Sequence, residues 1–105
     1  MTAVEQLLAS LEGFQWDEGN SDKSWRRHRV SQLDAEQVFF NQPVIALAGP
    51  RQGVEQRFFV LGRSDSGREL AIVFTIRGKL VRVISARPMS RRERRAYAQA
   101  KPSTD

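Results

Sequence analysis

The sequence contains no cysteine and only one histidine, His28, and one tyrosine, Tyr97. The absence of cysteine excludes both a disulfide framework and a thiolate metal site. There is no GxxxxGK[ST] phosphate loop and no HExxH zinc motif, and the carboxylates are not spaced as metal ligands. We therefore predict neither a cofactor nor a metal site.

Long apolar runs are also missing, and none approaches the ~20 residues needed to cross a membrane. The first residues carry glutamates and no positively charged region, so they do not resemble a signal peptide. A length of 105 residues suffices for one domain with one modest core. We expect a cytoplasmic protein that does not contact a membrane.

Negative charge is scarce in the C-terminal third of the chain. The net charge is +5, and Glu93 is the one acidic residue between Arg77 and Arg95. The basic residues of this stretch are Arg77, Lys79, Arg82, Arg87, Arg91, Arg92, Arg94 and Arg95. Such an excess indicates an acidic partner, either nucleic acid or an acidic protein.

Apolar periodicity predicts helices in the first forty residues. The predicted elements are an amphipathic helix from Val4 to Leu11, a short strand at Phe14–Trp16, a turn over 17–21, a helix over 22–29 capped by Asn20 or Ser21, and a helix from Gln32 to Phe40 capped by Ser31 with Asp34.

The period then changes to that of strands. Strands are predicted at Val44–Ala48, Arg57–Arg63, Leu70–Arg77 and Leu80–Arg87, and a last helix at Arg91–Ala100 begins with a Ser90/Glu93 capping box. This order predicts an α+β fold in which an antiparallel meander follows the helices. We divide the chain into an extra N-terminal helix (1–13), one domain (14–100) and a frayed tail (101–105).

Gly78-Lys79 fits the centre of a type II′ hairpin turn. The resulting register pairs Arg77 with Leu80 and Thr75 with Arg82. One face then carries Ile72, Phe74, Ile76, Val81 and Val83, and the other carries Val73, Thr75, Arg77, Arg82 and Ile84. A slip of one residue would bury an unpaired guanidinium, which is costly.

Two interpretations of the strand arginines stay open. They can form a solvated face with ion pairs to Glu36, Glu55 or Glu69, or they can bind phosphate, for which the planar guanidinium is well suited. Arg57 and Arg63 extend this face if their register allows.

Metal-independent RNA cleavage needs a base, cationic donors for the phosphorane and an acid for the leaving oxygen. His28 can serve as the general base, or it can interact as a cation with a helix C-terminus. Tyr97 can serve as a proton donor, or it can be a packing residue. Trp16 is predicted in the core, and Trp25 is left open between packing and base stacking.

An ordered set of motifs runs through the chain. It comprises Phe14-Gln15-Trp16-Asp17, Lys23, Arg27-His28, Ala35 to Phe40, Glu55 to Phe58, Leu61 to Ser64, Gly67-Arg68, Phe74 to Arg77, Val81 to Arg87 and Glu93 to Tyr97. From Phe14 to Tyr97 this order resembles the BrnT toxins, and the segment VRVISARPMSRRERRAY is its most specific part.

The resemblance implies a RelE-like fold, a type II toxin that cleaves RNA and blocks translation, and a BrnA-like ribbon-helix-helix antitoxin through which operator DNA is bound. The site residues implied are His28 and Glu55 as bases, Arg87 and Tyr97 completing the catalytic site, and Lys23, Arg77 and Arg82 as RNA-phosphate ligands.

The sequence departs from the family pattern in two places. Arg29 replaces a usual glycine, so it must avoid positive φ or accept strain, and the loop 49–52 lacks the Asp and His that relatives often carry. A non-catalytic module that only binds the antitoxin and acts as co-repressor is therefore an alternative. A free-standing DNA-binding protein is a weaker one, and a homo-oligomer built through the N-terminal helix is compatible with the sequence.

Overall fold

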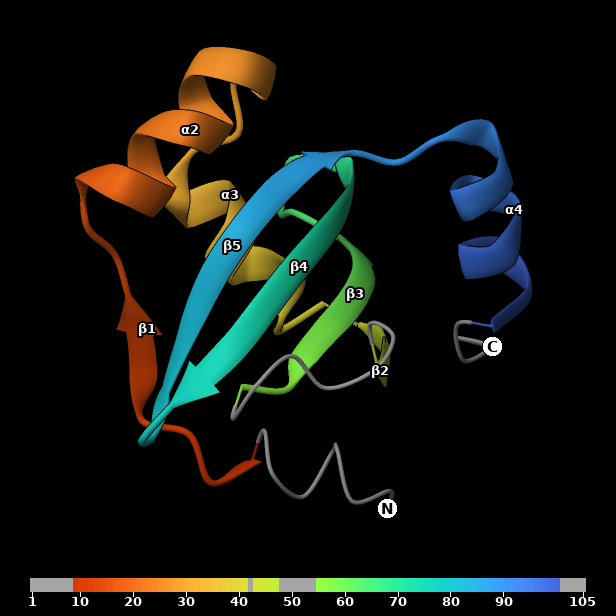
Figure 1. The fold of residues 1–105 in the computed structure, drawn as a ribbon. Helices are drawn as coiled ribbons and strands as arrows, with labels where there is room; N and C mark the ends of the chain where they lie inside the picture. The colour runs from red at the N-terminus through yellow and green to blue at the C-terminus, as the bar shows by residue number, and fades with distance from the viewer. Residues whose placement is uncertain (1–8, 42, 48–54, 101–105) are drawn as a thin grey trace.

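The computed structural model describes residues 9–41, 43–47 and 55–100. Its elements are β1 (Gly13–Gln15), α2 (Glu18–His28), α3 (Gln32–Val38), β2 (Val44–Leu47), β3 (Arg57–Arg63), β4 (Glu69–Arg77), β5 (Leu80–Pro88) and α4 (Arg91–Ala100). The strands form one sheet in the order β1-β5-β4-β3-β2. Figure 1 shows α3 behind the sheet and α4 beside one end of it. The predicted α+β class is confirmed.

The β4–β5 hairpin has the predicted register over its first half. Arg77 is opposite Leu80 and Thr75 is opposite Arg82. Gly78 has a φ of 63°, and Lys79 is not among the described residues with positive φ, as a type II′ turn requires. A bulge then shifts the register, so that Val73 is opposite Ser85.

The bulge makes one part of the predicted register wrong. The hairpin register predicts Ile84 opposite Val73, but Ile84 is the extra residue at the bulge and has no partner in the β4 register. Further along β5, Ala86 is opposite Ile72, which returns Ala86 to the core. Alternation therefore restarts one residue later than the sequence pattern indicates.

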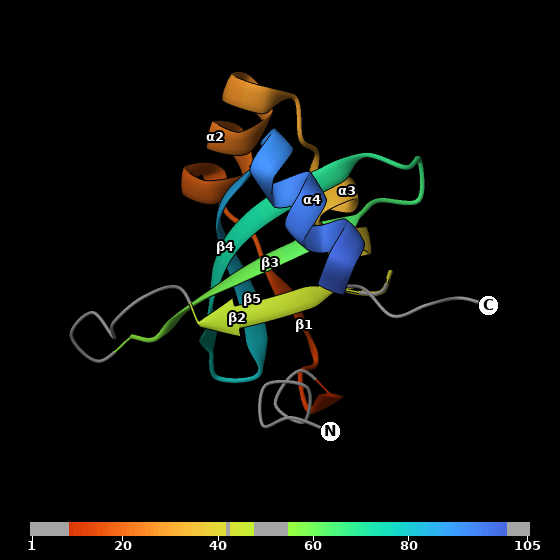
Figure 2. The ribbon, with the colours of Figure 1, turned by 90° about the vertical axis from the view of Figure 1, so that its right-hand side faces the viewer.

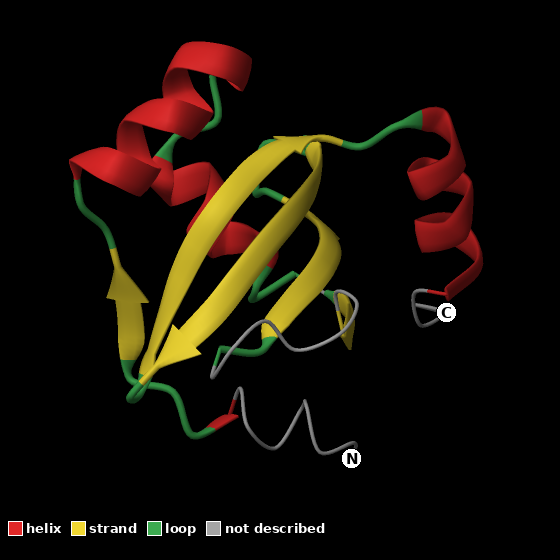
Figure 3. Ribbon diagram, in the orientation of Figure 1, coloured by secondary structure: helices red, strands yellow, loops and turns green. Residues whose placement is uncertain are grey.

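The main core lies between the sheet and α3. Phe74 is fully buried, with its ring 4.9 Å from that of Phe39 and 5.3 Å from that of Phe58. Gly62 of β3 is the point of closest approach to α3, because a Cβ there would lie 2.6 Å from Val38 Cγ1. We call this side of the sheet the core face; its buried residues include Val30, Ala35, Val38, Val60, Leu70, Ile72, Val81 and Val83. Figure 3 shows α3 passing behind the sheet and α2 beside the β5 edge.

Helix α2 begins earlier than predicted. The segment 17–21 was expected to be a turn, but Asp17 is the N-cap, its carboxylate accepts from the N–H groups of Gly19 and Asn20, and the helix starts at Glu18. Asn20 and Ser21, the predicted caps, lie inside the helix. The predicted caps of the other two helices are confirmed: Ser31 accepts from Asp34 N–H, and Ser90 and Glu93 form a reciprocal capping box.

Two buried polar residues of α2 complete the edge of β5. Asn20 Nδ2 donates to Val83 O at 3.0 Å, and Ser24 Oγ accepts from Ala86 N–H at 3.2 Å. Beyond the three residues where β5 pairs in parallel with β1, α2 therefore satisfies backbone groups that a further strand would otherwise pair with. The expected helix at Val4–Leu11 and the loop 49–53 lie mostly or wholly outside the described residues. Within the described part of the chain, no helix is long and apolar enough to span a membrane.

Candidate nucleic-acid interface

A polar row crosses four strands on the side of the sheet opposite to the core. Gln15 of β1 is opposite Arg82 of β5. Arg82 is in turn opposite Thr75 of β4, and Thr75 is opposite Arg57 of β3. Because residues opposite each other on paired strands share a face, these four side chains lie on one side. We call it the open face, since in Figure 1 no helix lies in front of this part of the sheet.

Arg82 is held in place from one side of the row. Its Nη1 donates to Asp17 Oδ2 at 2.9 Å and to Gln15 Oε1 at 3.3 Å, and its Nη2 donates to Asp17 Oδ1 at 3.3 Å. The hydrogen bonds from Arg82 hold the pKa of the Asp17 carboxyl below its ordinary value. These bonds use three of the five N–H donors of a guanidinium, and the remaining two can bind a ligand on the open face.

Arg57 occupies the other end of the same row. Its Nε is buried and has no hydrogen-bond partner among the described residues. No described carboxylate forms an ion pair with it, whereas Arg68, Arg82 and Arg87 each have one. The neighbouring Thr75 lies on this face, as predicted. It is 1% exposed, and its hydroxyl donates to Gln56 O.

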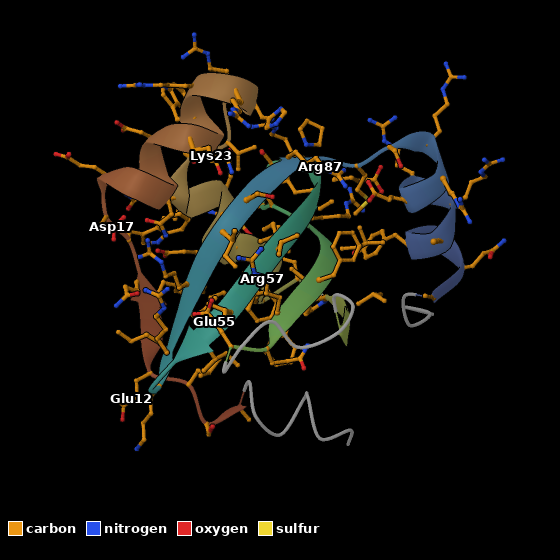
Figure 4. All side chains as sticks on the ribbon, in the orientation of Figure 1. Glu12, Asp17, Lys23, Glu55, Arg57 and Arg87 are labelled. Carbon is orange, nitrogen blue, oxygen red and sulfur yellow. The ribbon has the colours of Figure 1, made fainter. Side chains whose placement is uncertain are left out.

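Glu55 and Arg77 form a pair at the hairpin end of the open face. Arg77 Nε donates to Glu55 Oε1 at 3.1 Å, and the two side chains are 52% and 32% exposed. This is one of the ion pairs that the solvated-face interpretation named. Extending the β3–β4 register by two residues places Glu55 opposite Arg77, so this pair is one row, or about 7 Å, from Arg57 and Thr75. Figure 4 shows Glu55 and Arg57 together over the face turned to the viewer.

The other predicted site residues are not part of this cluster. Arg87 is opposite Ala71, six residues along β4 from Arg77, which separates the levels of Arg87 and Glu55 by about 20 Å. His28 is exposed and ends α2 one turn after Ser24, which contacts Ala86, so it is near the Arg87 end of the sheet. Since reacting groups must approach within about 3.5 Å, Glu55 cannot share one reaction centre with His28 and Arg87 in this arrangement.

Arg87 and Tyr97 both take part in the attachment of α4. Arg87 donates two hydrogen bonds to Glu93, at 2.6 and 2.8 Å, and they lower the pKa of Glu93 from 4.5 to about 2. Tyr97 is 1% exposed and packs with Leu61 and Met89, and burial raises the pKa of its hydroxyl. In Figure 2, α4 lies in front of β3 and β4. Catalytic roles for Arg87, Tyr97 and His28 stay predictions.

Lys23 is exposed on α2, and its direction follows from the rotation of about 100° per residue along the helix. Asn20 and Ser24 point to β5 and Ser21 binds Gln32 of α3, so Lys23, two residues or about 200° from Ser21, points away from α3. It therefore lies on the side of α2 that is turned away from α3.

Arg29 has the positive φ that is strained for a residue other than glycine. Its φ and ψ are 55° and 37°, in the left-handed region, and its guanidinium lies 5.3 Å from the ring centre of Trp25. Trp25 is 49% exposed, whereas Trp16 is partly buried against the core and donates from Nε1 to Glu36 at 2.8 Å. The core role predicted for Trp16 is confirmed.

The described residues thus define a small α+β domain with an arginine-lined sheet face that fits a polyanion. Among these residues, no group of three or more His, Asp or Glu side chains could hold a metal ion. The sequence model of the family described as the ribonuclease toxin BrnT of type II toxin–antitoxin systems matches residues 16–93. The chain belongs to this family, and so it is a ribonuclease toxin whose target is RNA and whose partner is an antitoxin. No curated protein sequence matches it.

Proposed function

We propose that the chain is an endoribonuclease that cleaves RNA on the open face without a metal ion. Glu55 accepts the proton of the 2′-hydroxyl next to the scissile phosphate, and the 2′-oxygen attacks phosphorus. Arg82 and Arg77 stabilise the charge that builds on the phosphorane oxygens. The bond to the 5′-oxygen breaks, water protonates that oxygen, and the products are a 2′,3′-cyclic phosphate and a 5′-hydroxyl end. Lys23 binds a flanking phosphate.

The observation that carries this proposal is the position of Glu55 one row from the arginines of the open face. Only one of its carboxylate oxygens is used by Arg77, so the other can accept a proton. A base and cationic donors within side-chain reach of one another are the minimum that cleavage of RNA by its own 2′-hydroxyl requires.

The test is incubation of the purified chain with RNA in EDTA. We expect cleavage to persist in EDTA and to leave 2′,3′-cyclic phosphate ends, and we expect Glu55→Gln to abolish most of it while Glu18→Gln, an exposed acid on α2, cleaves normally. Loss of cleavage in EDTA that Mg²⁺ restores would contradict metal independence. Absence of cleavage on free RNA and on translating ribosomes alike would favour the non-catalytic module.

We further propose that the antitoxin is a ribbon-helix-helix protein of the BrnA kind and that it contacts the exposed apolar side chains of α3 and of the residues that follow it. Phe40 is 76% exposed and Leu33 is 63% exposed, and Phe40 borders a groove of about 180 Å³ with Phe14, Phe39 and Val81. Exposed apolar side chains beside a groove are typical of a protein-binding surface. This surface is on the core-face side, away from the arginines.

Phe40→Ser should weaken antitoxin binding by about thirtyfold, the effect of losing one aromatic anchor, and should leave RNA cleavage unchanged. The measurement is titration of the purified toxin variants with the ribbon-helix-helix protein that we expect an adjacent gene to encode. Gln99→Ser, an exposed change on α4, is the control. Wild-type affinity in the Phe40 variant would place the antitoxin elsewhere.

A further inference from the structure

We infer that Arg57 is a further catalytic residue and that the scissile phosphate binds between Arg57 and Arg82, above Thr75. This inference rests on the proposed ribonuclease function. It adds a residue that the motif analysis named only as a possible extension of the basic face, and it gives the position of the phosphate on that face.

The register places the two arginines on either side of one small residue. Arg57 and Arg82 are both directly opposite Thr75, on the two strands that flank β4. Two strand spacings separate them by about 10 Å at the backbone. Long side chains that lean toward each other over a threonine can both donate to one phosphate. The Thr75 hydroxyl is turned to Gln56 O, so it does not compete for that phosphate.

The two guanidiniums differ in what already binds them. Arg82 is fixed by Asp17 and Gln15, so it is a preorganised donor. Arg57 has a buried Nε without a hydrogen bond. Four described arginines are partly buried, and Arg57 is the one among them without a described carboxylate partner.

A partly buried cation without an anion costs free energy in the folded state. An incoming phosphate removes that cost, and the poorly hydrated donor then interacts more strongly with it than a solvated one would. Because charge on the non-bridging oxygens increases as the 2′-oxygen attacks, Arg57 stabilises the transition state more than the bound substrate. Arg57 therefore contributes to the rate as well as to binding.

The experiment compares Arg57→Gln, Arg57→Lys and Arg63→Gln with the wild type. Arg63 is on the same strand and the same side but is exposed at the far end, opposite Glu69. One readout is the single-turnover cleavage of an RNA oligonucleotide. The second is the salt dependence of binding to the same oligonucleotide with 2′-O-methyl groups, which cannot be cleaved. The third is the urea midpoint of unfolding.

For Arg57→Gln we expect cleavage to fall about a hundredfold and the slope of log K against log salt to decrease in magnitude by about 0.7, the loss of one phosphate contact. The urea midpoint should not decrease, because the charge that is removed is partly buried and has no described carboxylate partner, whereas a purely structural arginine would lower it. Arg57→Lys should keep the salt slope and recover only part of the rate. Arg63→Gln should match the wild type.

Wild-type cleavage in Arg57→Gln would overturn the inference and leave the proposed function intact. If the wild type itself does not cleave RNA, the proposed function fails, and the salt slope alone decides whether Arg57 binds a phosphate. An unchanged slope in Arg57→Gln would then also overturn the phosphate contact of Arg57.

Discussion

Replacing Arg82 with alanine is expected to reduce the rate of RNA cleavage between about a hundredfold and a thousandfold, as the loss of a preorganised donor to a developing oxyanion does elsewhere. Arg82 has a fixed geometry on the open face, because Asp17 and Gln15 hold it with three hydrogen bonds. Its side chain is only 17% exposed, so little reorganisation is needed when the phosphate arrives. The measurement is single-turnover cleavage with saturating enzyme, which separates rate from affinity.

Two further variants separate catalysis from charge and from folding. Arg82→Lys keeps the positive charge but cannot bind Asp17 and a phosphate with one planar group, so we expect most of the rate loss to remain. Arg26→Ala removes an arginine with the same kind of partner, Asp22 at 3.5 Å, from an exposed part of α2, and should cleave normally. Equal rates for Arg82→Ala and the wild type would remove the open face from the mechanism.

Local sequence patterns predicted the hairpin but not its irregularity. Gly78 sets the turn, and the cost of burying Arg82 rejects the other register, so Thr75 and Arg82 could be paired in advance. The bulge at Ile84 coincides with tertiary contacts: Val83 O accepts from Asn20, and Ala86 N–H donates to Ser24 of α2. No feature of the β4–β5 sequence itself shows that a helix sixty residues earlier would occupy that edge.

The site was predicted only in part, for a similar reason. Arg82 and Arg77 follow from hairpin alternation, but Arg57 joins the row of Arg82 through the β3–β4 register, and the loop over 64–68 does not fix that register from sequence alone. Motif resemblance put Glu55 and Arg87 into one site, although the strand register separates their levels by about 20 Å. Arg87 also binds Glu93 of α4, and motif resemblance alone does not distinguish such a contact from a catalytic role.

The start of α2 shows how several good caps in one segment compete. Asp17, Asn20 and Ser21 are all residue types that favour an N-cap, and sequence reasoning selected the later ones. In the structure Asn20 is needed elsewhere: its Oδ1 accepts from Asp17 N–H at 2.8 Å, and its Nδ2 donates to Gln15 O and Val83 O. Asp17 is therefore the N-cap, and it also accepts a hydrogen bond from Arg82.

Asn20→Ala is accordingly expected to lower the free energy of unfolding by about 3 kcal/mol, because it leaves two carbonyls and one amide of the β1–α2–β5 junction without partners. Asn20 is 4% exposed, so water cannot replace its bonds without opening that junction. Urea unfolding gives the value, and Asp22→Ala is the matched control on the exposed side of α2, where only a surface ion pair is lost and the cost should stay below about 0.5 kcal/mol.

Asn20→Asp tests the direction of the bonds rather than the space the side chain fills. The second carboxylate oxygen would face Gln15 O and Val83 O, which accept but cannot donate, so this variant should be at least as unstable as the alanine variant. Because Asp17 begins the helix that Asn20 anchors, both variants should also lose cleavage through the misplacement of Arg82. If Asn20→Asp is as stable as the wild type, packing alone holds α2 against β5, and the orientation of Arg82 does not depend on Asn20.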